Sequence, residues 1–180
     1  MVAAFQVGKA PPALPSIRED LGATLEQAGW LLSVINLMTA LGGMAIALTA
    51  DRVGHRRLAI FGTLLAGAAS CAGAFAPNVE SLLVGRILEG LGFITVVVAV
   101  PTLLLRLTRP ADQRLAMAVW STYMPAGSGT MMVIAAIVLP GTSWRTVWLV
   151  AAGAAAMMAA ALLLRAVPRR ELDPLPVVRR

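Results

Sequence analysis

The sequence has little of the chemistry on which most soluble enzymes and metalloproteins depend. Its 180 residues include a single cysteine, Cys71, and a single histidine, His55. One cysteine excludes an intramolecular disulfide framework, and one histidine with one cysteine cannot supply the ligand set of a metal site. We therefore expect no metal ion and no cofactor.

Charge is also scarce. Only 13% of the residues are charged, 58% are hydrophobic, and the mean hydropathy is +0.79. A soluble domain of this length needs far more polar surface. The net charge of +6 often indicates a nucleic-acid partner. Here the charges lie in the connections between apolar blocks, so we expect none.

The apolar blocks lack the alternation of apolar and polar residues that is typical of barrel strands. Each block holds about 20 residues, the length that crosses the hydrocarbon core as a helix. Helices also satisfy their own backbone hydrogen bonds, which lipid cannot do. The sequence therefore predicts an all-α, polytopic membrane helix bundle.

Residues 1–167 are predicted to form six spans, the first of them incomplete. The spans cover roughly residues 1–16, 28–50, 58–76, 82–105, 115–139 and 144–166. The first helix is truncated, because it has only about fourteen residues before Pro15 and a crossing needs about 20. Either the start site lies elsewhere or the chain is a fragment. Residues 168–180 combine prolines with charges, and we expect them to form a linker or tail.

Orientation follows from lysine and arginine, which collect in cytoplasmic loops. Connections between successive spans lie alternately on the two sides of the membrane. One side holds eleven of these residues and the other holds two, while Lys9 and Arg86 fall within spans. The larger group consists of Arg52, Arg56, Arg57, Arg106, Arg109, Arg114, Arg165, Arg169, Arg170, Arg179 and Arg180. The smaller group is Arg18 and Arg145. We therefore expect a cell-membrane protein with both termini in the cytoplasm, and with Trp30, Trp144 and Trp148 at the outer interface.

Small residues recur at close to four-residue spacing on two of the predicted helices. These residues are Gly62, Ala66, Ser70 and Ala74 on one helix, and Gly43 and Ala47 on another. Small side chains let helix backbones approach closely in lipid. The spacing predicts close helix packing along both faces.

The basic turn at residues 51–57 lies between two apolar blocks. Gly54 suits a sharp reversal of the chain. Asp51 stands beside arginines, and its carboxylate can pair with one of them or cap a helix. Such contacts can break and re-form as helices slide, which makes the turn a candidate gate. The alternative is a plain cytoplasmic anchor.

The same run resembles the loop signature G-x-L-x-D-R-x-G-R-R of the major facilitator superfamily. Four residues match: Asp51, Arg52, Gly54 and Arg56. Three depart from the signature: Ala47, Thr49 and His55. The resemblance implies that Asp51 and its arginines, Arg57 included, hold the two halves of a transporter together on the cytoplasmic side.

A second segment, residues 82–92, is similar to the fourth-helix motif R-x-x-Q-G-x-G of this family. Arg86, Gly90 and Gly92 match, and Glu89 replaces the usual glutamine. Independently of any family, an arginine within an apolar span is costly, and Glu89 three residues on shares its helix face. Two interpretations stay open: a structural ion pair, or a cavity-lining pair used in substrate binding or proton coupling.

Lys9 lies within the first span, where a lysine should face the bundle interior. Together with Arg86 it would make a cavity positive and suit an anionic substrate. The alternative is that the depth of Lys9 in the membrane is undefined, because the first span is truncated.

The resemblance covers roughly residues 11–167 and implies one half of a transporter with two six-helix bundles. The implied function is secondary transport of a small solute by alternating access, with proton coupling as a candidate, and the implied partner is a second six-helix bundle. The fourth and fifth spans are similar to the cyanate and nitroimidazole transporter branch. The fifth lacks the G-P-x-x-G-G pattern of the drug–proton antiporters, which disfavours a drug exporter.

Two rival functions fit parts of the sequence. Ser128 lies in a Gly-Ser-Gly run that resembles part of the nucleophile turn of an intramembrane serine protease. A serine needs a base within hydrogen-bond reach, and His55 lies in the basic turn, so we do not expect an enzyme. The other rival is a membrane subunit or scaffold that transports nothing.

Overall fold

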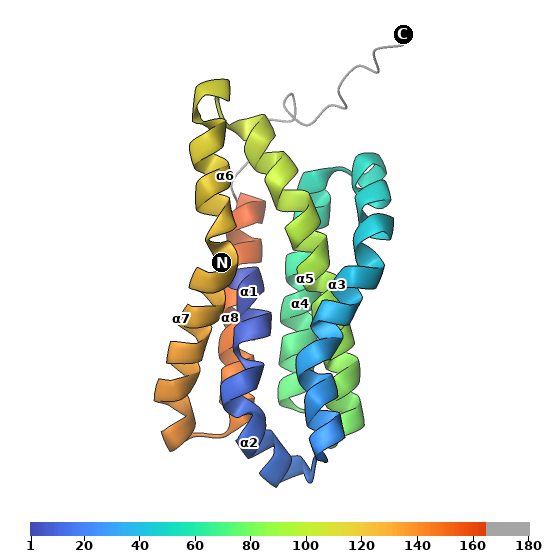
Figure 1. Cartoon of the computed structure of the whole chain (residues 1–180), viewed down its shortest axis with the longest axis vertical. Coiled ribbons are helices and arrows are strands. Elements are labelled where there is room, and N and C mark those ends of the chain that lie inside the picture. The colour runs from blue at the N-terminus through green and yellow to red at the C-terminus, as the bar shows by residue number, and fades with distance from the viewer. Residues whose placement is uncertain (165–180) are drawn as a thin grey trace.

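The structure, a computed structural model, describes residues 1–164, and for Asp51 only the backbone. The described chain is an all-helical bundle (Figure 1). Its α-helices are α1 (Val2–Gly8), α2 (Ala10–Leu21), α3 (Leu25–Val53), α4 (His55–Ala74), α5 (Val79–Leu107), α6 (Gln113–Ser121), α7 (Tyr123–Val138) and α8 (Trp144–Leu164). Two 3-10 turns, η1 (Pro110–Asp112) and η2 (Leu139–Gly141), flank the α6–α7 pair. The predicted tail at residues 168–180 lies outside the described residues.

Five segments of the described chain are long and apolar enough to cross a membrane. They are Leu25–Ala50, His55–Ala74, Val79–Leu107, Pro110–Gly141 and Trp144–Leu164. Each overlaps one of the five complete spans predicted from the sequence, and the predicted helical class is confirmed.

The first span is two helices joined at Lys9. Pro11 and Pro12 have no N–H group to donate to the carbonyls of the preceding turn, so the hydrogen-bond ladder is interrupted there. Lys9 keeps helical angles and both ends α1 and begins α2. The helix runs on to Leu21, five residues past the predicted boundary at Ser16, and stops where Gly22 adopts φ +63°.

The fifth span is also divided, into α6 and α7, with Thr122 between them. Pro125 cannot donate to the carbonyl of Ser121, four residues earlier, so the first helix ends there. A new helix begins at Tyr123. The sequence analysis predicted one continuous helix here, and the proline explains the difference.

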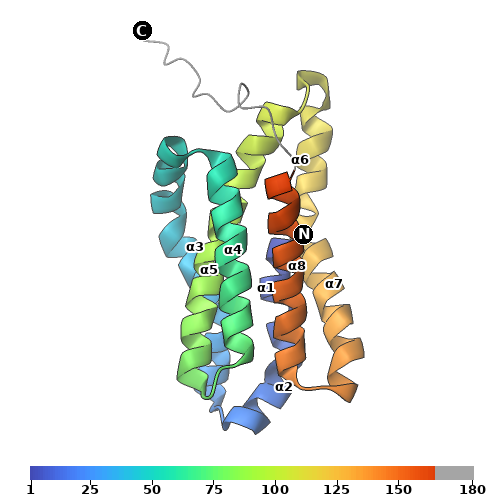
Figure 2. The ribbon, with the colours of Figure 1, turned by 180° about the vertical axis from the view of Figure 1, so that it is seen from behind.

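Small residues bring the central helices together. Figure 2 shows α4 between α5 and α8. A side-chain carbon added to Gly92 would lie 2.7 Å from the carbonyl oxygen of Gly62, and one added to Gly67 would lie 3.0 Å from Ala155 on α8. The predicted small-residue face of α4 is therefore a packing face. Gly43 on α3 has nothing within 4 Å, so the second predicted face is not packed within the described chain.

The bundle is apolar on its outside. Large side chains such as Leu41, Met44, Ile137 and Leu164 are 68–83% exposed. A surface of this kind suits hydrocarbon and not water. The interior holds small residues, some large apolar side chains and a few polar ones.

Two tryptophans pack inside the bundle. Trp144 and Trp148 are fully buried and pack edge to face with ring centroids 5.3 Å apart. Gly73 on α4 leaves room for the Trp148 ring. The depth of the tryptophans at the outer interface stays a prediction. Trp30, near the start of α3, is about half exposed.

Candidate functional site

A group of polar side chains is buried inside the bundle, and we call it the ionic cluster. Its members come from α1, the α1–α2 joint, α4 and α5, and each is at most 1% exposed. They are Gln6, Lys9, Ser70, Arg86 and Glu89. Three of these five were predicted as site residues.

Glu89 is the centre of the ionic cluster. Its Oε1 accepts a hydrogen bond from Lys9 Nζ at 2.7 Å, and its Oε2 accepts one from Arg86 Nη1, also at 2.7 Å. The predicted pairing of Arg86 with Glu89 one helical turn away is present. Because Lys9 pairs with the same carboxylate, the first span is tied to α5 through a fully buried contact.

Lys9 has a complete set of acceptors. Besides Glu89, its Nζ donates to Gln6 Oε1 and to Ser70 Oγ, both at 2.6 Å. An ammonium group has three N–H donors, so all three are used. The Nζ atom also lies 4.6 Å from the centroid of the Trp148 ring, a cation–π distance. Lys9 faces the interior of the bundle, as a lysine within a span should.

Arg86 joins three segments. Its Nε donates to the carbonyl oxygen of Leu31 on α3 at 3.0 Å, and its Nη1 donates to the carbonyl oxygen of Gln6 on α1 at 2.6 Å. These bonds and the one to Glu89 offset the cost of burying a guanidinium group. Two cations nevertheless face one carboxylate, so the ionic cluster carries an excess positive charge.

Two buried donors around the cluster have no acceptor within the described residues. They are Gln6 Nε2 and Trp148 Nε1. Gln6 uses its amide oxygen on Lys9, which leaves the nitrogen without a partner. The sequence analysis missed Gln6, although a polar residue three positions before Lys9 shares its helix face and was a usable signal.

Gly90 on α5 packs closely against α3. A side-chain carbon on it would lie 3.0 Å from Met38 Cβ and 3.2 Å from Ile35 Cα. The missing side chain lets α3 lie directly against α5. Its predicted part in substrate binding or coupling stays a prediction.

The basic turn lies away from the ionic cluster, at one end of the bundle. Gly54 alone joins α3 to α4 with φ +93°, a conformation that favours glycine, so the predicted sharp turn is present. Arg56 donates from Nη2 to the carbonyl oxygen of Leu162 at 2.8 Å, near the end of α8. Arg52 and Arg57 are exposed. The side chain of Asp51 lies outside the described residues.

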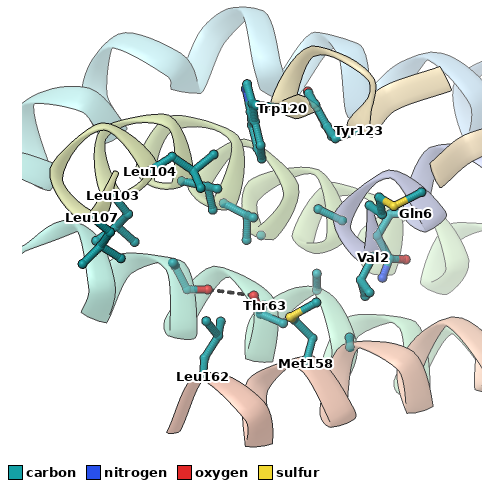
Figure 3. A pocket seen from close by; sticks show the side chains of 18 residues that line it. Val2, Gln6, Thr63, Leu103, Leu104, Leu107, Trp120, Tyr123, Met158 and Leu162 are labelled. Atoms are coloured by element: carbon teal, nitrogen blue, oxygen red, sulfur yellow. Dashed lines mark hydrogen bonds between the residues drawn. The ribbon is translucent and has the colours of Figure 1, made fainter. Parts of the chain in front are cut away.

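A cavity of about 280 Å³ lies beside the ionic cluster, bounded by α1, α4, α5, α8 and the α6–α7 joint (Figure 3). Its lining is mostly aliphatic, with Gln6, Thr63 and Tyr123 as polar members. The rings of Trp120 and Tyr123 stack with centroids 4.3 Å apart. No sequence motif indicated this cavity, because its walls come from segments far apart in the chain. Gln6 is the residue that belongs to both cavity and cluster.

A second polar group ties helix ends at the opposite end of the bundle. Trp144 Nε1 and Arg145 Nη2 both donate to Asp20 Oδ2 at 3.0 Å. Arg145 Nη1 donates to the carbonyl oxygens of Ala74 and Ala76, each at 3.0 Å. Asp20 lies beyond the predicted first span, and the hydrogen bond from Trp144 and the contact with Arg145 hold the pKa of its carboxyl below the usual value.

Ser128 does not have the surroundings of a nucleophile. Its Oγ donates to the carbonyl oxygen of Met124 at 2.7 Å, one turn back on α7. Gly8 on α1 packs against the backbone of Ser128. This is a hydroxyl satisfied by its own helix, which gives no support to the protease hypothesis.

Comparison with known proteins agrees with the helical architecture. A model of the Major Facilitator Superfamily matches residues 1–179. The multidrug efflux pump LfrA of Mycolicibacterium smegmatis is 31% identical over 140 residues, which cover 77% of this chain and 28% of that protein. The major facilitator superfamily multidrug transporter mfsC of Aspergillus fumigatus is 26% identical over 172 residues, 93% of this chain and 33% of that protein.

A third relative is the methyl viologen resistance protein SmvA of Salmonella typhimurium. It is 28% identical over 141 residues, which cover 77% of this chain and 28% of that protein. The chain therefore spans a third or less of the length of each of these curated relatives.

Proposed function

The chain belongs to the major facilitator superfamily, and on this premise we propose that it is one half of a secondary active transporter that exports organic compounds. The family consists of membrane transporters and not of enzymes, and its members are multi-pass membrane proteins that bind small-molecule substrates. The observation that carries the proposal is the ionic cluster. Charged side chains inside a membrane bundle are costly and are retained where they serve a function.

The names of the relatives support an organic substrate. Two are described as multidrug transporters and one as a methyl viologen resistance protein. None of these three is described as a cyanate or nitroimidazole transporter, so they give that predicted branch no support. The missing G-P-x-x-G-G pattern argues against drug export, and the proposed substrate class rests on the relatives instead.

The geometry of Lys9 also argues against the anionic substrate that the sequence suggested. All three of its donors are used within the protein, and Arg86 is paired with Glu89 and two carbonyl oxygens. Neither Lys9 nor Arg86 lines the cavity, and each is at most 1% exposed. A largely apolar organic compound fits the mostly aliphatic cavity better.

Transport by alternating access requires a second bundle against which this one rocks. A second six-helix bundle is the proposed partner. We assign Asp51, Arg52, Gly54, Arg56 and Arg57 to the contact between the halves, with the turn end of the bundle and both termini in the cytoplasm. Arg52 and Arg57 are exposed, and Arg56 is fixed to the end of α8, so the turn is both accessible and rigidly mounted.

We assign Lys9, Arg86 and Glu89 to the coupling of transport to protons. They connect α1 to α5 through contacts that a change in protonation would remake. Gly90 contributes by letting α3 lie against the same part of α5.

The proposal is tested by drug export from cells that make the chain together with a second six-helix bundle taken from one of the relatives. Methyl viologen accumulation is measured for the parent, for Arg86→Gln, and for Arg114→Gln as an exposed control of the same chemistry. We expect Arg86→Gln to lower the export rate at least about tenfold, equivalent to ~1.4 kcal/mol, with unchanged membrane insertion. Arg114→Gln should keep the parent rate.

Export by Arg86→Gln at the parent rate would contradict the assigned role of the ionic cluster. If cells accumulate each compound, methyl viologen and a panel of larger drugs, to the same level with and without the paired chain, the proposed substrate class is contradicted.

A further inference from the structure

The ionic cluster holds one more positive charge than negative charge. Lys9 and Arg86 face Glu89 alone, and all three are at most 1% exposed. Among the described residues, the other groups that contact Lys9 are uncharged: Gln6 from α1 and Ser70 from α4, with the Trp148 ring from α8. Burial in an apolar interior penalises net charge. The loss of one proton would make the cluster neutral.

Of the three groups, only Lys9 can lose that proton. A guanidinium group is not deprotonated in proteins. Glu89 accepts a hydrogen bond on each carboxylate oxygen from a cation, which is the geometry of an ionised carboxylate with no proton to give. The Lys9 ammonium is the remaining source.

The unpartnered nitrogen of Gln6 indicates where a second arrangement would form. In the structure, Gln6 Oε1 accepts from Lys9 and Gln6 Nε2 has no partner. A neutral amine carries a lone pair and accepts a hydrogen bond. Rotation of the Gln6 amide by half a turn would then place its N–H donor on that lone pair, while Lys9 keeps two N–H bonds for Ser70 and Glu89. The same side chain lines the cavity (Figure 3), so the cavity reaches the ionic cluster at Gln6.

We propose that Lys9 is the group that releases and takes up the coupling proton, and that the Gln6 amide is its two-position partner. On release, an N–H bond of the ammonium breaks and its electron pair stays on Nζ. The proton bonds to the oxygen of a water molecule that has entered through the cavity, which gives hydronium. The structure holds the protonated arrangement. The inference rests on the proposed function in one respect, because it takes the ionic cluster as the coupling site.

The composition of the chain makes the test direct, because Lys9 is its only lysine. In full-length chain labelled with ¹³C- and ¹⁵N-lysine and placed in lipid nanodiscs, the lysine side-chain NMR signal belongs to Lys9 without further assignment. We expect this signal to change from ammonium to amine as the pH is raised, and the Gln6 amide signal, read from a second sample labelled with ¹⁵N-glutamine, to change at the same pH. A signal that stays ammonium throughout, or that changes without Gln6, overturns the inference.

Gln6→Glu tests the charge count. It replaces the amide by a carboxylate of the same size, so the cluster would hold two cations and two anions. We expect Lys9 in this variant to stay ammonium across the whole range. The matched control is Gln113→Glu on α6, whose side chain bonds the Leu105 carbonyl and not the cluster; it should follow the parent. A Gln6→Glu titration identical to that of the parent overturns the inference. If this variant does not fold, the titration of the parent protein alone tests the inference.

The two proposals fail separately. Loss of export in Arg86→Gln together with a Lys9 signal that never becomes an amine would refute the inference and leave the transport proposal standing. A coupled Lys9–Gln6 transition in a chain that exports nothing would support the inference and refute the transport proposal.

Discussion

Single residues decide whether the interior of this bundle is stable, and Glu89 is the clearest case. Its carboxylate is the counter-charge of two buried cations. Removing one partner of a buried ion pair leaves an uncompensated charge and costs about 3–5 kcal/mol. We expect Glu89→Gln to lower the free energy of unfolding in detergent by about that amount.

The control for this prediction is Glu19→Gln, the same change at an exposed site of α2. Thermal unfolding followed by circular dichroism compares the two variants with the parent. Equal midpoints for Glu89→Gln and Glu19→Gln would show that the carboxylate is not needed by its neighbours.

The residues of the ionic cluster were predictable to different degrees. Arg86 and Glu89 lie three positions apart on one helix, so their contact follows from local geometry. The contact of Glu89 with Lys9 depends on how α1 packs against α5, and no local pattern encodes that packing. Gln6 could have been found, because it shares a helix face with Lys9.

At the scale of helices, the contact between α4 and α5 depends on two glycines. A side-chain carbon on Gly92 would meet the backbone of α4 at 2.7 Å, both at the Gly62 oxygen and at the Ala66 nitrogen. Backbone atoms cannot step aside as a flexible side chain can. We expect Gly92→Ala to destabilise the bundle by about 1–3 kcal/mol, because the two helices must separate.

Gly153→Ala on α8 is the matched control, since a side-chain carbon there meets nothing within 4 Å. Alanine also favours a helix over glycine, so this variant should be neutral or more stable. Unfolding midpoints in detergent are compared for both. A Gly92→Ala protein as stable as Gly153→Ala would show that the helices do not approach so closely.

The group of Asp20, Trp144 and Arg145 predicts a pH dependence at the end of the bundle opposite the basic turn. The pKa of Asp20 is lower in the folded chain than in the unfolded one. Its contribution is therefore fully present above the unfolded pKa, about 3.9, and is lost as the pH falls through the folded value. We expect the thermal unfolding midpoint of the parent to fall when the pH is lowered below about 4. The midpoint of Asp20→Asn should fall less over the same pH range.

The control is Asp112→Asn, which changes an exposed aspartate in η1. Its acid profile should match that of the parent. If Asp20→Asn also follows the parent profile below about pH 4, the contact with Trp144 and Arg145 does not stabilise the fold.

The positions of the long helices could be predicted from hydropathy, because the thickness of the hydrocarbon core sets the length of a helix that crosses it. The breaks at Lys9 and Thr122 were not predicted, although prolines shortly after each remove the N–H groups that continuity needs. The burial of Trp144 and Trp148 could not be predicted, because it depends on space that small residues of a neighbouring helix leave, as at Gly73.

For the whole molecule, the family was predictable and the substrate was not. The basic turn and the fourth-helix motif are local runs, and they resemble the family that the comparison then showed. In the proposed two-bundle transporter, substrate choice depends on side chains that line the space between the bundles, and no local run in this chain encodes them. Similarity to cyanate transporters, inferred from the look of two helices, therefore had no physical basis.

The account depends most on a bundle that spans the membrane with its arginine-rich end in the cytoplasm. Figure 1 shows the α3–α4 turn and the α5–α6 connection at one end, opposite the α2–α3 and α7–α8 connections. In a Cys71→Ser background, Arg109→Cys and Gly141→Cys place one thiol at each end, both at exposed positions. A membrane-impermeant maleimide added to intact cells should label Gly141→Cys and should reach Arg109→Cys only after the membrane is opened. Labelling of Arg109→Cys in intact cells, or equal labelling of both variants, would contradict the account.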